Sequence, residues 1–170
     1  MISVEQALSN ILAAAKPVTD TETLPLATAL GRVLAQDQLA TVNVPPANNS
    51  AMDGYAINTA DLQADTDNWL PLSQRIPAGH APSQHIAHSA ARIFTGGEIP
   101  VGANAVVMQE QCEIAENGHV IFPAELINAK PQQNIRPAGQ DIARGQTLFQ
   151  PGRILRAEDL GVVASMGFSQ

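Results

Sequence analysis

The chain has 170 residues, a net charge of −7 and a charged fraction of 15%, and this length suits one compact domain or two small ones. Its few lysines and arginines are scattered without a basic stripe, which argues against nucleic acid or an acidic membrane surface as a partner. One cysteine excludes an internal disulfide, and we expect a cytoplasmic protein because neither a signal peptide nor a long apolar run is present.

The first predicted element is a helix over residues 3–15. Ser3 and Gln6 match a capping box at its start, and Pro17 ends the pattern. Its apolar residues recur at helical spacing and form one stripe: Val4, Ala7, Leu8, Ile11, Leu12 and Ala15. We expect this stripe to lie in a core or an interface.

Two further elements follow before the chain changes character. Residues 25–30 are typical of a short helix, since Pro25 suits its first turn and Gly31 its end. Residues 32–42 alternate apolar and polar side chains, which predicts a half-buried strand.

From residue 43 to about 140, short β-prone runs are separated by glycine, proline, asparagine and histidine. The pair Asn117-Gly118 between two such runs predicts a hairpin. Short strands at this spacing indicate a small barrel or sandwich rather than a parallel sheet. Residues 142–154 then resemble strand–turn–strand, and a final helix is expected over 156–166 with Gly167 beyond its end.

The isolated metal and thiol candidates have simpler interpretations. His80, His85 and His88 suggest zinc, but no second ligand pair accompanies them, so solvated loop histidines are favoured. Cys112 falls in an alternating strand-like pattern and is expected to behave as a small apolar residue.

Three turn-associated clusters remain, and each places polar or ionisable groups beside glycines. The first is NNSAMDGYA (48–56), the second FTGGEIPVGANAVVMQE (94–110) and the third NIRPAGQDI (134–142). Backbone at such glycines can approach a ligand closely. Residues that only stabilise turns would explain any one cluster, so both interpretations stay open at this point.

Particular side chains in these clusters suggest chemistry. Asp53 and Asp141 are candidate oxygen ligands for Mg²⁺, with Glu110 as a third. Thr95 precedes two glycines and could help to bind an anion. Arg136 is the cation nearest to Asp141 in the sequence.

Taken together and in order, the three clusters resemble the N-terminal half of the molybdopterin molybdenumtransferases, the molybdenum-insertion enzymes related to the gephyrin E-domain. The resemblance covers essentially all 170 residues. It implies an α+β, mainly β fold, in which a small distorted β-barrel is inserted into an elongated segment with N- and C-terminal helices. We expect residues 1–43 and 141–170 to form that segment and 44–140 to form the inserted domain. A catalytic α/β domain would begin just after a position like Gly167 and is absent here.

The resemblance also implies an activity and a site. These enzymes use Mg²⁺ to insert molybdate into adenylylated molybdopterin, release AMP and act as homodimers. Carried over by motif, Asp53, Thr95 and Asp141 would be catalytic, with Asp53 and Asp141 as metal ligands. Arg136 and Glu110 would contact the cofactor substrate.

The expected partners are a second subunit, the adenylyltransferase of the same pathway and the molybdenum enzymes. The isolated chain is expected to be inactive. The alternative is a non-catalytic dimerisation or scaffolding module of a gephyrin-like protein. Two positions just before Asn49-Ser50 depart from the family pattern, because Ala47 and Asn48 replace the usual aromatic and acidic residues. A third departure is Gly97, which replaces a frequent alanine.

Overall fold

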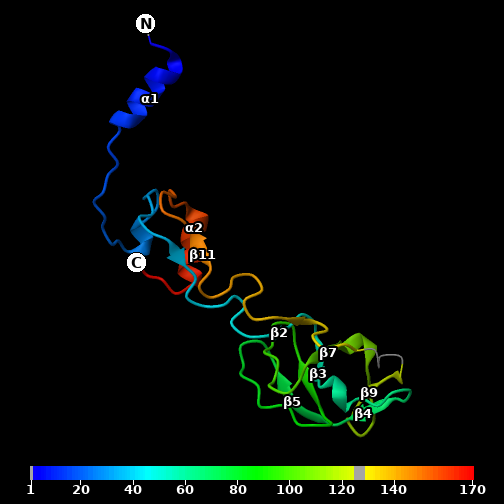
Figure 1. The fold of residues 1–170 in the computed structure, drawn as a ribbon. Coiled ribbons are helices and arrows are strands. Elements are labelled where there is room, and N and C mark those ends of the chain that lie inside the picture. Colours follow the sequence, from blue (N-terminus) through cyan, green and yellow to red (C-terminus); the bar gives the residue numbers. More distant parts are fainter. Residues whose placement is uncertain (1, 125–128) are drawn as a thin grey trace. The chain divides into compact units, whose positions relative to one another are not determined.

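The computed structural model describes residues 2–124 and 129–170, and its fold is mainly β with two helices (Figure 1). The helices are Val4–Ala14 (α1) and Ala157–Ser165 (α2), and short 3₁₀ turns cover Leu26–Thr28 (η1), Thr59–Asp61 (η2) and Gln109–Gln111 (η3). The strands run over Gln38–Leu39 (β1), Asn49–Ser50 (β2), Gly54–Ile57 (β3), Asn68–Leu70 (β4), Leu72–Ile76 (β5), Ala90–Ile93 (β6), Ala105–Met108 (β7), Glu113–Ile114 (β8), Val120–Phe122 (β9), Ile135–Arg136 (β10) and Thr147–Phe149 (β11).

The chain divides into two compact units. The terminal unit contains the residues up to Asp37 together with Phe149–Gln170, and the central unit contains Gln38–Leu148. Neither helix in the described part of the chain has the length and apolar character that crossing a bilayer requires.

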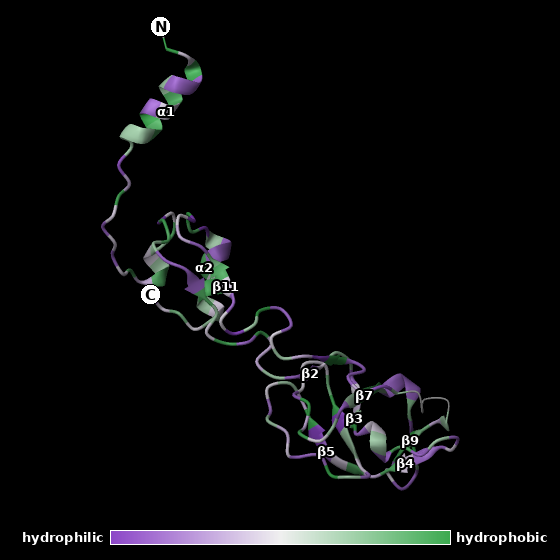
Figure 2. Ribbon diagram, in the orientation of Figure 1, coloured by the Kyte–Doolittle hydropathy of each residue, from purple (hydrophilic) through white to green (hydrophobic). Residues whose placement is uncertain are grey.

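Helix α1 confirms the predicted helix at the N-terminus. The hydroxyl of Ser3 accepts a hydrogen bond from the backbone N–H of Gln6 at 3.1 Å, but the Gln6 side chain donates to Asn10, so only half of the capping box forms. None of its residues is buried, and Figure 2 shows hydrophobic and hydrophilic residues alternating along its ribbon. The apolar stripe therefore belongs to no core within this structure; Leu8 and Ile11 are 55% and 67% exposed.

In the rest of the terminal unit, the segment around residues 25–34 pairs with the C-terminal segment. Val33 bridges Ile154, and the carbonyl of Leu155 accepts a hydrogen bond from Gly31 N–H at 2.8 Å. The final helix is confirmed as α2, and Gly167 follows its end with a positive φ of 86°. The helix expected over 25–30 shortens to the single turn η1, and the N–H of Leu26, which has no acceptor within the turn, donates to the carbonyl of Ser169 in the C-terminal segment.

Residues 32–42 do not form the predicted half-buried strand. Only β1 and the bridge at Val33 are β structure, and Val33 is 60% exposed. Alternation alone gave the wrong expectation here, because a strand also needs a partner along its length and the facing segment pairs at only a few positions.

The central unit contains a four-stranded sheet in the order β5-β6-β3-β7 and a three-stranded sheet in the order β4-β9-β8. The remaining strands form the pairs β1-β11 and β10-β2. The hairpin predicted at Asn117-Gly118 joins β8 and β9, and Gly118 adopts a φ of 79°. Strands β5 and β6 are parallel, while the other strand pairs of these two sheets are antiparallel, so neither is the parallel sheet that the sequence argued against. The described strands form separate sheets and no closed barrel.

Two apolar clusters form the core of the central unit, one on each face of β3. Tyr55 and Ile57 point into the first, where the rings of Tyr55 and Phe122 meet edge to face at 6.1 Å. Ala56 points into the second, beside Ile76 and Ile93. The strand that follows Asp53 is thus buried on both faces. Its packing fixes the position of Asp53, which directly precedes the strand.

Candidate functional site

Strand β2 lies where the three sequence clusters meet. On one side it pairs with β10 of the third cluster, with Ile135 opposite Ser50 and Arg136 opposite Asn49. On the other side Ser50 exchanges hydrogen bonds with the second cluster, donating to Gly97 at 2.9 Å and accepting from Gly96 at 2.8 Å. Ser50 is fully buried, and its hydroxyl donates to the carbonyl of Met52 at 2.6 Å. The tertiary structure thus brings all three clusters together.

Asp53 and Thr95 are in direct contact. Oδ1 of Asp53 accepts hydrogen bonds from the backbone N–H of Thr95 at 2.7 Å and from its Oγ1 at 2.8 Å. These bonds, the backbone one first, hold the pKa of Asp53 below its ordinary value, so the carboxylate is charged near neutral pH. In the described structure no hydrogen bond reaches Oδ2 of Asp53, so that oxygen can accept from, or coordinate, a ligand.

Glu110 lies in the same neighbourhood. The backbone N–H of Gln109 donates to the carbonyl of Asp53 at 3.1 Å, and Nε2 of Gln109 donates to Oε1 of Glu110 at 3.0 Å. The pKa of Glu110 is lowered, first by this side-chain hydrogen bond and then by its own backbone, while the negative charge of Asp53 opposes the shift. The structure therefore places two carboxylates within electrostatic reach of each other.

Arg92, on β6, connects these elements. Its Nη1 donates to the carbonyl of Gly54 at 2.9 Å and its Nη2 donates to Oε1 of Gln109. The guanidinium also lies over the rings of Tyr55 and Phe94, 5.2 and 4.6 Å from their centroids.

Sequence reasoning missed both Arg92 and Gln109. A charged residue between the buried Ala91 and Ile93 was the available signal, because a half-buried arginine in a strand needs acceptors. No comparable signal singles out Gln109, whose role depends on the pairing of β3 with β7.

Two glycines of the motifs are required by close packing. A Cβ on Gly54 would lie 2.0 Å from the carbonyl oxygen of Val107 on β7. A Cβ on Gly97 would lie 2.8 Å from the carbonyl oxygen of Ile76. The alanine that the family pattern often shows at position 97 would therefore require a local shift of this backbone.

Arg136 and Asp141 belong to the third cluster, whose strand β10 pairs with β2 of the first cluster. Arg136 is exposed on β10, and the backbone N–H of Asp141 donates to the carbonyl of Val44 at 2.9 Å. Among the described residues no hydrogen bond or ion pair joins Asp141 to Asp53. The structure thus unites Asp53, Thr95 and Glu110, and places Arg136 and Asp141 on the adjacent segment without a direct link.

Asn48, one of the departures from the family pattern, supports that adjacent segment. Its Oδ1 accepts a hydrogen bond from the backbone N–H of Ala138 at 2.8 Å, and its carbonyl accepts one from Ile99 at 2.9 Å. An aspartate also offers a side-chain oxygen at this position. The change to asparagine therefore keeps an acceptor for the third cluster and removes one negative charge.

The described residues contain no group of three histidine, cysteine or carboxylate side chains placed to hold a metal ion. Mg²⁺ does not require such a group, because it keeps several waters and binds one or two carboxylates together with substrate phosphates. The free Oδ2 of Asp53, with Glu110 nearby, fits a partial donor set of this kind.

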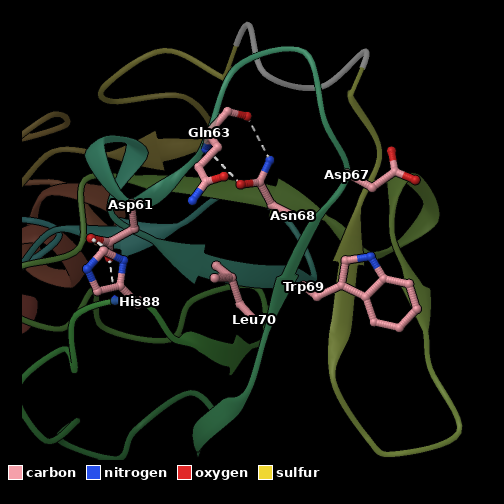
Figure 3. A pocket seen from close by; sticks show the side chains of 7 residues that line it. All are labelled: Asp61, Gln63, Asp67, Asn68, Trp69, Leu70 and His88. Atoms are coloured by element: carbon pink, nitrogen blue, oxygen red, sulfur yellow. Dashed lines mark hydrogen bonds and ion pairs between the residues drawn. The ribbon is translucent and has the colours of Figure 1, made fainter.

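One pocket lies elsewhere in the central unit. It has a volume of about 400 Å³ and is lined by Asp61, Gln63, Asp67, Asn68, Trp69, Leu70 and His88 (Figure 3). None of these residues belongs to the three clusters, and Asn68 is engaged by hydrogen bonds with Gln63.

The histidines and the cysteine form no separate site. His85 is buried rather than solvated as expected: its side chain is 3% exposed and its Nε2 lies 3.2 Å from Oδ2 of Asp61. Cys112 follows η3 rather than lying in a strand, and packs against the core as an apolar residue. Burial raises the pKa of its thiol to about 12, so it is not an activated thiolate.

Comparison with known proteins gives consistent matches over the whole chain. A family model described as "MoeA N-terminal region (domain I and II)" matches residues 2–167. A molybdopterin molybdenumtransferase of Haemophilus influenzae is 39% identical over 100% of this chain and 41% of its own length. Molybdopterin molybdenumtransferase 2 of Mycobacterium tuberculosis is 35% identical over 98% of this chain and 40% of its own.

A solved structure supports the fold. The crystal structure of a molybdopterin biosynthesis moeA protein from Pyrococcus horikoshii OT3 superposes with a TM-score of 0.82 at 34% identity, covering 97% of this chain and 44% of that one. The chain thus spans about two fifths of the length of the relatives that it matches.

Proposed function

The chain belongs to the family of MoeA N-terminal regions, and on that premise we propose that it is the N-terminal part of a molybdenum-insertion enzyme. In molybdenum cofactor biosynthesis, this enzyme inserts molybdate into adenylylated molybdopterin in a Mg²⁺-dependent reaction that releases AMP. The observation that carries the proposal is the contact between Asp53 and Thr95 at the place where the three family motifs meet.

We assign the chemistry of this region to Asp53, Thr95 and Asp141, with Arg136 and Glu110 as contacts for the substrate. Mg²⁺ would supply neutralisation of the phosphate charge in the reaction. Thr95 uses both of its donors on Oδ1 of Asp53, which orients the carboxylate, and Oδ2 would then be the oxygen that holds the metal. Asp141 would add a second carboxylate from the adjacent segment once substrate is bound.

The relatives are longer than the part that this chain matches, and we infer that the complete activity also needs their further regions. We propose that a catalytic α/β domain follows, that residues 44–140 form the inserted domain between 1–43 and 141–170, and that the isolated chain does not insert molybdenum. We also propose that the complete enzyme is a cytoplasmic homodimer. Its further partners would be the adenylyltransferase of the pathway and the molybdenum enzymes, with no nucleic acid or membrane partner.

One observation also suits a second function. The apolar residues of α1 are exposed, as Val4 and Leu12 illustrate, and such a face is suited to association with another protein surface. A non-catalytic dimerisation or scaffolding module would bind its partner through this face, and its function would not depend on the Asp53–Thr95 contact. The two functions therefore differ in whether the carboxylates matter.

A chimera can distinguish them. This chain replaces the corresponding N-terminal region of the Haemophilus influenzae relative, and molybdate-dependent AMP release from adenylylated molybdopterin is measured. Asp53→Ala and Asp141→Ala are each expected to lower the rate on the order of 100-fold or more, because the Mg²⁺ that would neutralise the phosphate charge loses a ligand. Asp20→Ala, which changes an exposed aspartate outside the motifs, is the matched control.

Dimerisation is measured on the same samples by light scattering. The enzyme proposal predicts dimers of unchanged mass in every variant and a rate lost only at positions 53 and 141. Wild-type rates in both of those variants would contradict it and favour the scaffolding module.

A further inference from the structure

We propose that Arg92 is a positioning residue of this site, acting through Gln109 to hold Glu110 in place beside Asp53. The inference rests on the proposed function, since it concerns the same carboxylates. It goes further by identifying the group that fixes their arrangement.

Arg92 connects three backbone segments. From β6 it donates to the carbonyl of Gly54, the residue directly after Asp53, and to the side chain of Gln109. Gln109 in turn donates its backbone N–H to the carbonyl of Asp53 and its Nε2 to Glu110. A single guanidinium therefore restrains both the start of β3 and the turn η3 that carries Glu110.

The chemistry of arginine decides which way the Gln109 amide points. A guanidinium has donors and no acceptor, so it must face Oε1 of Gln109. The Nε2 group is then directed to Glu110, where it donates at 3.0 Å. Without Arg92 the Gln109 amide loses the donor that holds its oxygen away from Glu110. The amide can then rotate, and in the reversed orientation its oxygen would repel the carboxylate of Glu110.

The guanidinium is itself held in place. It lies against the rings of Tyr55 and Phe94, and Tyr55 is fixed in the core by its contact with Phe122. Among the described residues no carboxylate forms an ion pair with Arg92. Lysine offers a point charge without the planar fork, so it would keep the charge and lose the simultaneous bonds to Gly54 and Gln109.

Arg75 provides the matched control. It lies opposite Arg92 on the neighbouring strand β5 and also stacks over Phe94, at 4.5 Å. It is exposed, and the structure shows no hydrogen bond from it to the two carboxylates or to Gln109. Arg75→Lys therefore makes the same chemical change one strand away without touching the proposed link.

The first test is spectroscopic and uses this chain. Arg92→Lys is expected to move the side-chain amide resonances of Gln109 and the carboxyl carbon resonance of Glu110. Arg75→Lys is expected to leave both at their wild-type positions. The inference is overturned if the two variants move these resonances equally, or if Arg92→Lys moves neither. Gln109→Met removes the acceptor of Arg92 and serves if Arg92→Lys fails to fold. It is then expected to move the guanidinium resonances of Arg92 and the carboxyl carbon resonance of Glu110, and unchanged resonances of both groups would overturn the inference.

The second test uses the chimera described above. Arg92→Lys and Gln109→Met are each expected to lower kcat by on the order of 10- to 100-fold, because a misplaced group near the reacting atoms is costly. If both act on one link, the double variant is no slower than the slower single variant. Multiplied effects, or a rate for Arg92→Lys equal to that of Arg75→Lys, would overturn the inference.

The two tests separate this inference from the proposed function. An inactive wild-type chimera counts against the function, while the resonances of Gln109 and Glu110 still decide the role of Arg92. An active chimera that tolerates Arg92→Lys counts against the positioning role alone.

Discussion

Asp53 and Thr95 lie 42 residues apart in the sequence, yet a single carboxylate oxygen of Asp53 accepts two hydrogen bonds from Thr95. One donor is the backbone N–H and the other is the hydroxyl. Two bonds from one residue fix both the position and the rotation of the carboxylate. The second carboxylate oxygen therefore has a defined direction in which to meet a ligand.

Removal of the Thr95 hydroxyl is expected to raise the pKa of Asp53. Thr95→Ala keeps the backbone donor and loses the side-chain donor, and both donors favour the charged carboxylate. Thr95→Ser keeps both donors and is expected to titrate like the wild type. The carboxyl carbon resonance of Asp53, followed against pH, reports the change; identical titrations for alanine and serine would show that the hydroxyl has no part in it.

Gly54→Ala is expected to destabilise the central unit. The new methyl group would lie 2.0 Å from the carbonyl oxygen of Val107, so β3 and β7 must separate at the residue next to Asp53. Overpacking of this kind costs about 1–3 kcal/mol or more.

Gly161→Ala is the control for that substitution. Gly161 lies within α2 with nothing within 4 Å of an added Cβ, so alanine there is expected to stabilise the helix by about 0.5–1 kcal/mol. Urea unfolding followed by circular dichroism measures both variants. A Gly54→Ala protein as stable as the wild type would refute the packing argument.

Phe122→Ala is expected to cost about 3–5 kcal/mol of unfolding free energy, because it opens a cavity in the first core cluster. Phe122 is 1% exposed and supports the ring of Tyr55 beneath Arg92. Trp69→Ala, on the adjoining strand β4, removes a larger ring that is 54% exposed, and is expected to cost under about 1 kcal/mol. Thermal and urea unfolding measure the loss of stability in both variants. A larger loss in Trp69→Ala than in Phe122→Ala would contradict the assignment of Phe122 to the core.

Asp159 is expected to make the terminal unit sensitive to acid. Its buried carboxylate accepts hydrogen bonds from Nε and Nη2 of Arg153 at 3.0 and 2.7 Å and from the backbone N–H of Arg156 at 3.0 Å. The Arg153 hydrogen bonds are the largest cause that lowers the pKa of Asp159. Since the folded pKa lies below the unfolded value of about 3.9, this stabilisation is present above pH 4 and is lost as pH falls through the folded value.

The measurement is the melting temperature between pH 7 and pH 2. Asp159→Asn should lower it at pH 7 and flatten its dependence on pH below 4, whereas Glu158→Gln, at the exposed neighbouring position, should leave the dependence unchanged. An unaltered acid profile in Asp159→Asn would show that other carboxylates dominate.

Local signals in the sequence were sufficient wherever a few neighbouring residues determine the backbone. Ser3 with the apolar stripe predicted α1, Asn117-Gly118 predicted the β8–β9 hairpin, and Gly167 marked the end of α2. Hydrogen bonds and dihedral preferences over three to five residues decide such features. The acidic residue and the hydroxyl of the main contact, Asp53 and Thr95, were also identified from their motifs.

Only the tertiary structure decided which distant segments pair. The parallel contact of β5 with β6, the short β structure in residues 32–42 and the roles of Arg92 and Gln109 depend on partners far along the chain. A residue's own neighbours carry no information about which acceptors another strand will present. The sequence by itself determined the local turns and the chemistry that each motif offers, and tertiary packing decided which of those groups meet.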